Sequence, residues 1–125
     1  ARLATVEAGT AGRVAALFAQ AAHRQNATSQ QFFCGGLVLP GLPSETSELI
    51  AAAKDVASSH NASVGMAVGP VRPSGVRHAV DIVVVNNGKP IITEHILGGG
   101  GIAMSRAAKS AIDQIRRILL SHKKN

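Results

Sequence analysis

The sequence predicts an α/β protein with three layers, α/β/α, in which helices cover both faces of a mixed, mostly parallel sheet of five strands. Short apolar runs alternate with longer segments whose apolar residues repeat at helical spacing, in the order β-α-β-α-β-β-β-α. The first two strand–helix units imply parallel neighbours, because a strand that follows a crossover helix runs in the same direction as the first. The pair Asn87–Gly88 between two apolar runs predicts a two-residue turn and therefore one antiparallel hairpin.

The N-terminal part begins with a strand over Arg2–Glu7, which is mostly apolar. A short turn follows, and Thr10 is well placed to cap the next helix, because its hydroxyl can accept a hydrogen bond from a free backbone N–H. This helix continues to Arg24 and ends in a polar stretch. One of its faces is apolar and consists of Val14, Leu17, Phe18 and Ala21.

The second strand, Phe32–Leu39, contains Gly35 and Gly36, which indicate a bulge or a close approach of the backbone to another group. Pro40–Pro43 forms a turn, and a second helix follows and ends at Asn61. The residues of this helix that we expect to face the core are Leu49, Ala53, Val56 and Ala57.

The C-terminal half is predicted to contain three strands, a Pro- and Gly-rich loop at Gly69–Gly75 and the Asn-Gly turn. A loop of four glycines, Gly98–Gly101, then leads into a last helix over Ile102–Ser121. The three strands are Ser63–Val68, Ala79–Val84 and Pro90–Leu97. In the last helix, Ala108, Ile112, Ile115 and Leu119 face the core, whereas Arg106, Lys109, Asp113 and Arg117 face outward.

Composition limits the classes to which the chain can belong. Its length of 125 residues fits one domain. Hydrophobic residues make up 46% of the chain and charged residues 16%, a composition that argues against disorder. A single cysteine excludes an intrachain disulfide framework, and no apolar run is long enough to span a bilayer. We therefore expect a cytoplasmic domain without membrane contact. The net charge of +6 favours an anionic partner, and exposed sheet edges favour a homo-oligomer.

Several stretches of the sequence match a known pattern in order and spacing. L-A-T-V-E-A-G-T-A-G at Leu3–Gly12 is similar to L-A-T-A-E-S-C-T-G-G, and F-F-C-G-G-L-V-L at Phe32–Leu39 is similar to F-x-G-G-V-V-A. V-G-M-A-V-G-P at Val64–Pro70 is similar to a strand that ends in T-G-I-A-G-P, and the strand Ala79–Val84 and the Ala-rich last helix take matching places. Together they resemble the CinA C-terminal domain, whose active members are nicotinamide-nucleotide amidases. The resemblance implies a single domain of this type over residues 1–125.

The positions that are reactive in that family differ in this chain. The nucleophilic Ser of the family is replaced by Ala8, whose methyl group cannot attack a carbonyl. Pro40 stands where the family has an active-site Tyr, and Gly100 stands at its substrate-contacting Arg. Glu7 and Thr10 match the family. The resemblance therefore implies a divergent, pseudoenzyme-like CinA domain without amidase activity, which acts as a ligand-binding or oligomeric module.

Two other functions stay open. The chain would be a nicotinamide mononucleotide amidohydrolase if Thr10 served as the nucleophile and Glu7 as its base. It would be a basic module for nucleic acid or another anionic partner if its Lys and Arg residues formed one surface. The residues considered for that surface are Arg72, Arg77, Arg116, Arg117, Lys123 and Lys124.

Glycine-rich turns form the predicted site for a small phosphorylated ligand, because free N–H groups before a helix can face a phosphate. We expect no metal and no cofactor, since the five histidines lack the spacing of metal ligands. Cys34 is predicted to be a core residue without a basic neighbour. The predicted ligand-contacting residues are Gly9, Thr10, Gly35, Gly36, Gly69, Gly98, Gly99 and Gly100.

Overall fold

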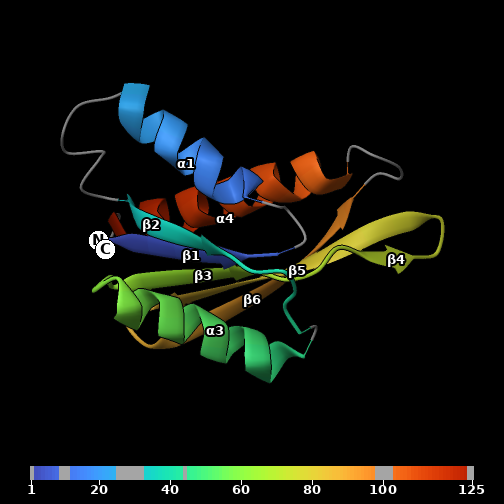
Figure 1. The fold of residues 1–125 in the computed structure, drawn as a ribbon, viewed down its shortest axis with the longest axis horizontal. Coiled ribbons are helices and arrows are strands. Elements are labelled where there is room, and N and C mark those ends of the chain that lie inside the picture. Colours follow the sequence, from blue (N-terminus) through green and yellow to red (C-terminus); the bar gives the residue numbers. More distant parts are fainter. Residues whose placement is uncertain (1, 9–11, 25–32, 44, 98–102, 124–125) are drawn as a thin grey trace.

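Six strands and three helices make up the described part of the chain (Figure 1). The structure is a computed structural model that describes residues 2–8, 12–24, 33–43, 45–97 and 103–123. No helix within these ranges is both long and apolar enough to cross a bilayer. In chain order the elements are β1 (Leu3–Glu7), α1 (Arg13–Arg24), β2 (Phe33–Val38), α3 (Thr46–Ser59), β3 (Val64–Val68), β4 (Arg72–Ser74), β5 (Arg77–Asn86), β6 (Lys89–Leu97) and α4 (Ala103–Lys123).

The sheet is mixed. β1 pairs in parallel with β2 and β3, whereas β5 pairs antiparallel with β3, β4 and β6. Residues 82–86 of β5 pair with both β3 and β6, so those two strands lie on opposite edges of β5. Ala79 pairs with Arg72 of β4 and with Ile96 of β6, which places β4 on the same edge as β3. β2 and β6 are therefore outer strands, and the short β4 also pairs along one edge only.

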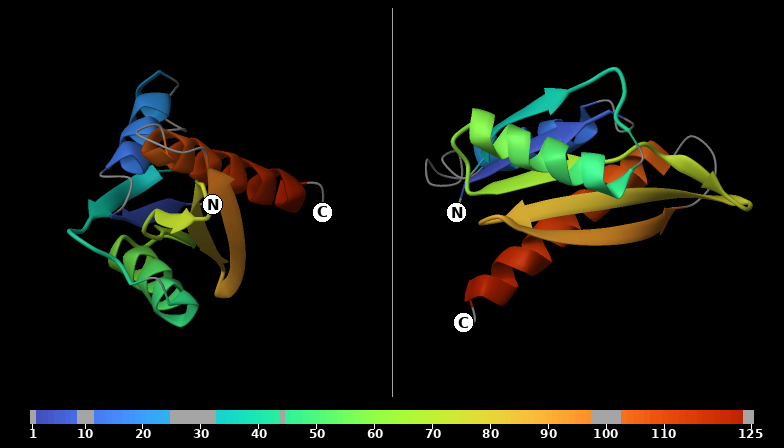
Figure 2. Two further views of the ribbon diagram at one scale, coloured as in Figure 1. Left: turned by 90° about the vertical axis from the view of Figure 1, so that its right-hand side faces the viewer. Right: turned by 90° about the horizontal axis from the view of Figure 1, so that it is seen from below.

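Helices cover both faces of the sheet, as predicted. α1 and α4 lie side by side on one face and α3 lies on the other (Figures 1 and 2). Because successive side chains of a strand point to opposite faces, Met66 joins the apolar core under α1 and α4, and Ala67 joins the core under α3. Phe18 of α1 stacks on Phe33 of β2, with ring centroids 5.4 Å apart. The inner residues predicted for the second helix are all buried: Leu49, Ala53, Val56 and Ala57.

The α/β class, the mixed sheet and its hairpin are confirmed, whereas the number and direction of the strands differ from the prediction. The sheet has six strands, and its pairings are two parallel and three antiparallel. The additional strand, β4, lies in the segment predicted as a loop. Pro73 is compatible with this strand because β4 is short and pairs only with β5, so the missing N–H breaks no ladder. Gly75, at φ +64°, allows the turn that returns the chain to β5.

Candidate functional site

The carboxyl ends of the three parallel strands meet at one edge of the sheet. Glu7 at the end of β1 pairs with Val38 of β2 on one side and with Val68 of β3 on the other. β1 is followed by α1 on one face of the sheet, and α3 leads to β3 on the other face. In open α/β sheets, ligands bind outside the strand ends where the connections diverge in this way. We therefore take this edge as the candidate site.

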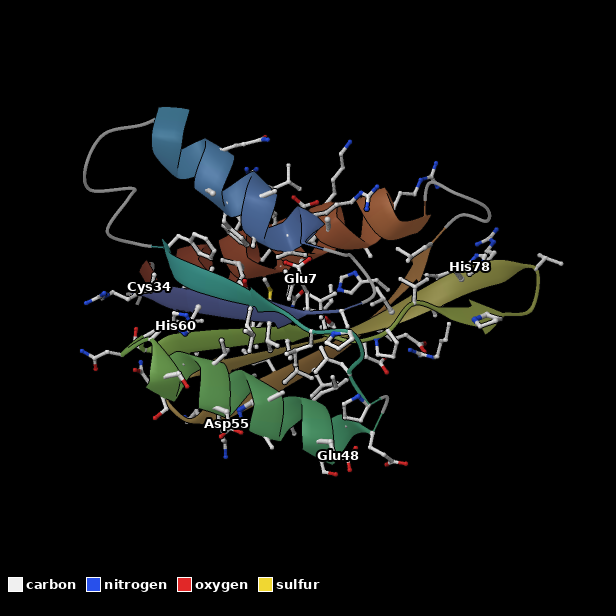
Figure 3. All side chains as sticks on the ribbon, viewed as in Figure 1. Glu7, Cys34, Glu48, Asp55, His60 and His78 are labelled. Atoms are coloured by element: carbon white, nitrogen blue, oxygen red, sulfur yellow. The ribbon has the colours of Figure 1, made fainter. Side chains whose placement is uncertain are left out.

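The buried carboxylate of Glu7 organises this edge. Its side chain is fully buried and lies at the start of α1 (Figure 3). Oε1 accepts hydrogen bonds from the backbone N–H groups of Gly12 and Val14, both at 3.0 Å, and Oε2 accepts one from Ala15 at 2.8 Å. The first N–H groups of a helix have no partner within the helix, and the helix dipole makes this end positive. Glu7 therefore satisfies these groups and holds α1 against the end of β1.

This capping role is a finding that the sequence prediction missed. The cap was expected from Thr10, which lies outside the described residues, as do Gly9, Gly98, Gly99 and Gly100. A carboxylate several residues before a helix matches no local capping pattern. Its position at the end of a fully buried strand was the available signal, because a buried charge needs hydrogen-bonding partners nearby.

The glycines that were predicted to contact a ligand and that the structure describes are in contact with protein groups. A Cβ on Gly36 would lie 2.7 Å from Thr5 Oγ1 and 2.8 Å from Ala15 Cβ, so α1 packs closely on the sheet there. A Cβ on Gly35 would lie 3.1 Å from the ring of His60. The N–H of Gly69 donates to the carbonyl of Asp81 at 2.9 Å. The close approaches at Gly35 and Gly36 account for small residues at these two positions without invoking a ligand.

Cys34 has a basic neighbour, contrary to the prediction. The Nε–H of Arg2 donates to Cys34 Sγ at 3.1 Å. The strand register passes from Leu3 opposite Phe33 to Ala4 opposite Gly35, so Cys34 occupies a bulge, as the glycine pair had indicated. The prediction about its neighbours was wrong because parallel strand pairing brings together residues that are distant in the sequence.

Comparison with known proteins now identifies the architecture. No family model and no curated protein sequence matches the chain. Among solved structures, a competence-damaged protein (CinA) superfamily protein from Klebsiella pneumoniae has a TM-score of 0.74 at 16% identity, over 96% of this chain and 88% of its own. This chain has the CinA fold. The superfamily protein from Enterobacter cloacae has a TM-score of 0.68 at 15% identity, over 96% and 81% of the two chains.

A third structure of this fold, the competence or damage-inducible protein from Enterobacter asburiae, has a TM-score of 0.66 at 14% identity, over 96% of this chain and 86% of its own. The resemblance noted in the sequence is thereby confirmed for the fold. Identities this low carry no information about activity, so function has to be argued from the site itself.

Within this CinA fold, the predicted site residues that the structure describes converge only in part. Glu7, the half-buried Ala8, the exposed Pro40 and Gly69 all lie at or directly after the carboxyl ends of β1, β2 and β3. Gly35 lies farther from this edge, opposite Ala4 in the β1–β2 ladder. Neither Ala8 nor Pro40 carries a group that can attack a carbonyl or transfer a proton.

Two histidines, His60 and His95, lie within hydrogen-bonding distance of other groups of the chain. His60 Nδ1 lies 2.9 Å from the carbonyl oxygen of Val56, and His95 Nε2 lies 2.9 Å from Thr93 Oγ1. Burial lowers the pKa of His95, the positive charge of Arg117 lowers it further, and Asp113 opposes this change. Among the described residues, no three His, Cys, Asp or Glu side chains are grouped so that they would hold a metal ion.

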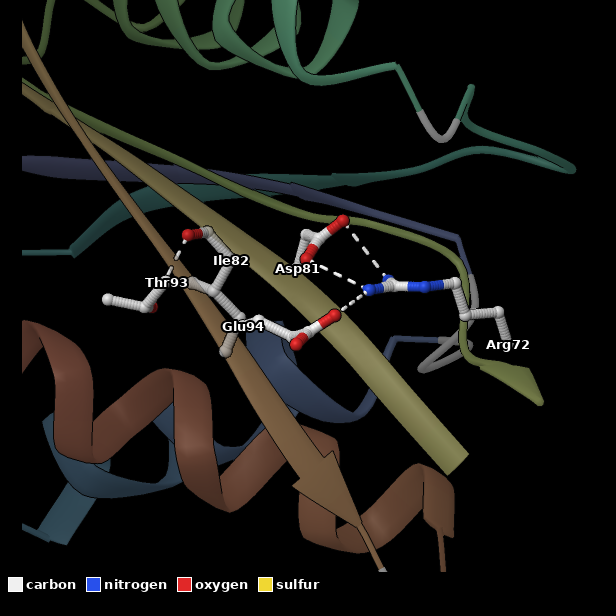
Figure 4. Close-up of polar contacts among 5 residues, drawn as sticks. All are labelled: Arg72, Asp81, Ile82, Thr93 and Glu94. Atoms are coloured by element: carbon white, nitrogen blue, oxygen red, sulfur yellow. Dashed lines mark hydrogen bonds and ion pairs between the residues drawn. The ribbon is translucent and has the colours of Figure 1, made fainter. Parts of the chain in front are cut away.

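The described Lys and Arg residues that the sequence suggested as one binding surface lie in different parts of the structure. Arg72 of β4 forms an ion pair with Asp81 at 3.1 Å and another with Glu94 (Figure 4). Its guanidinium is thus used to join β4, β5 and β6. Arg116 and Arg117 are exposed on α4, whereas Arg77 is at the start of β5.

Proposed function

We propose that this chain is a CinA-like domain that lacks nicotinamide-nucleotide amidase activity and acts as a binding or oligomeric module. The observation that supports this most strongly is the environment of Glu7. Its carboxylate is buried and accepts hydrogen bonds from three backbone N–H groups, and the next residue is Ala8, where the resembling family carries its nucleophile. The site therefore keeps the structural residue of the motif and lacks the reactive one.

The alternative amidase, with Thr10 as nucleophile and Glu7 as base, conflicts with this geometry. A general base needs a lone pair directed at the proton that it removes. Glu7 directs both carboxylate oxygens at α1, and its fully buried side chain is closed to solvent. Each hydrogen bond to a charged group contributes about 1.5–3 kcal/mol, so turning this carboxylate toward a substrate would cost several kcal/mol.

Ammonia release from nicotinamide mononucleotide tests the proposal. We expect purified protein to release no more ammonia than a heat-denatured sample, while a CinA superfamily amidase with an intact Ser nucleophile serves as the positive control. The matched control for Thr10→Val is Thr46→Val on α3. If the wild-type protein released ammonia, and this activity were lost in Thr10→Val but kept in Thr46→Val, the alternative amidase would be established.

The oligomeric part of the proposal is supported by β6. This outer strand has one edge that no other described strand pairs with, and it exposes Ile91, Ile92 and Ile96 by 37%, 46% and 51%. Unpaired strand edges with apolar side chains favour association. Light scattering on a size-exclusion column tests this part: we expect a mass above that of one chain, and a lower mass for Ile92→Lys. A monomer at all concentrations would refute it.

The ligand-binding part depends on the sequence of Gly98–Gly101, which falls outside the described residues. A thermal-shift experiment with inorganic phosphate and with nicotinamide mononucleotide tests it, because a ligand that binds the folded state raises the unfolding temperature. An unchanged melting temperature at millimolar concentrations of both would refute this part.

A further inference from the structure

Charge is distributed unevenly across the sheet. α1 and α4, which share one face, carry seven Lys and Arg residues and a single acidic residue, Asp113. On the opposite face, α3 carries two acidic residues and one basic residue. The positive net charge of the chain is thus concentrated in one layer. Side chains that end in nitrogen extend from α1 and α4 away from the sheet (Figure 3).

The basic residues of α4 form one row. Arg106, Lys109, Arg116 and Arg117 are all exposed, and their spacing places them on one side of the helix. The opposite side of α4 is buried through Ala107, Ala108, Ala111, Ile115 and Ile118. At about 1.5 Å per residue, the row extends over about 16 Å. Asp113 is also exposed and offsets one of the four positive charges, so the row keeps a clear positive excess.

The side chains that the structure describes on α1 and α4 include no exposed large apolar residue of the kind found at the centre of protein-binding sites. Protein interfaces depend on aromatic or large apolar side chains at their centre. The exposed large apolar residues of the described chain are Leu37, Val38, Val76, Ile91, Ile92 and Ile96, none of which belongs to α1 or α4. Base stacking needs exposed aromatic rings, and of the two aromatic residues within the described ranges, Phe18 is buried and stacks on Phe33. A regular array of phosphates, which needs only cations, fits this surface better than an acidic protein or unstacked bases.

We propose that the outer face of α4, defined by Arg106, Lys109, Arg116 and Arg117, binds the phosphate backbone of duplex nucleic acid without reading its sequence. The proposal deepens the proposed function and rests on it in one respect, since it names a partner for the binding module. Hydrogen bonds to the phosphates orient the helix along the duplex, and no base edge is contacted.

The salt dependence of binding tests this proposal. A labelled DNA duplex of mixed sequence is titrated with the protein, and fluorescence anisotropy is measured at several potassium chloride concentrations. Each neutralised phosphate contributes a slope of about −0.9 to the plot of log K against log salt, so four cations, one partly offset by Asp113, predict a slope between about −2.7 and −3.6. The double variant R116Q/R117Q should make the slope shallower by about 1.8 and weaken binding at every salt concentration.

The matched control is K54Q/K89Q. It lowers the net charge by the same amount, but Lys54 lies on α3 and Lys89 at the start of β6. This variant should keep the wild-type slope. No binding at low salt, a slope near zero, or equal losses in both double variants would overturn the proposal.

Two competitors distinguish the other kinds of partner. The proposal would also be overturned if polyglutamate competed as strongly as the duplex at equal charge. The same holds if single-stranded DNA bound more tightly than the duplex. The amidase assay has an independent readout. Ammonia release with an unchanged salt slope would refute the proposed function while leaving the duplex site standing.

Discussion

The variant Glu7→Gln tests the structural role of the buried carboxylate with almost no change in volume. Glutamine replaces one acceptor oxygen with an NH₂ group, which can only donate and therefore faces a backbone N–H of α1. Of three hydrogen bonds to a charged group, at least one is lost and the others weaken. Each of these hydrogen bonds contributes about 1.5–3 kcal/mol, and their loss is partly offset because the variant no longer buries a charge. We therefore expect the free energy of unfolding to fall by about 2–4 kcal/mol.

Urea unfolding followed by circular dichroism at pH 7 measures this loss. The control is Glu48→Gln, an exposed acidic residue in the first turn of α3, for which only a few tenths of a kcal/mol are expected. Hydrogen exchange adds a local readout, because the N–H groups of Val14 and Ala15 should lose protection before those of α3. If Glu7→Gln unfolded at the same urea concentration as the wild type, Glu7 would not hold α1 in place.

Three further variants probe packing and titration. A Cβ on Gly65 would lie 2.0 Å from the carbonyl oxygen of Ala53, so Gly65→Ala should destabilise the fold by about 3 kcal/mol in urea, and a loss below 1 kcal/mol would contradict this packing. Thr5 Oγ1 is buried without a hydrogen-bond partner among the described residues, so Thr5→Val should raise the unfolding free energy by about 1 kcal/mol, and lower stability would reveal a missing partner. Because the pKa of His95 is lowered on folding, the unfolded state binds its proton more readily. Stability should therefore fall as the pH drops below 6.5, and His95→Gln should flatten this part of the profile; an unchanged profile would exclude His95 as its source.

Local patterns predicted much of the fold. The inner residues of α3 follow from helical spacing, and all four are buried. The Asn87–Gly88 turn follows from its residues, and both have positive φ, 50° and 86°. These features depend on neighbours in the chain, which a single sequence displays directly.

Other features depend on contacts between distant segments. β4 has the composition of a loop and becomes a strand because β5 provides a partner for it. Arg2 reaches Cys34 only through the pairing of β1 with β2. The role of Glu7 requires α1 to begin directly beside the end of β1, and the basic face requires α1 and α4 to share one side of the sheet. Spacing along the chain does not encode these proximities.

The most direct test of the central claim is the turnover of nicotinamide mononucleotide by the wild-type protein, measured as ammonia against protein concentration. With Ala8 in place of a nucleophile and the Glu7 carboxylate held by the amides of α1, the rate should equal that of buffer at every concentration. A rate that increases in proportion to protein concentration, and that persists in independently purified samples, would contradict the account.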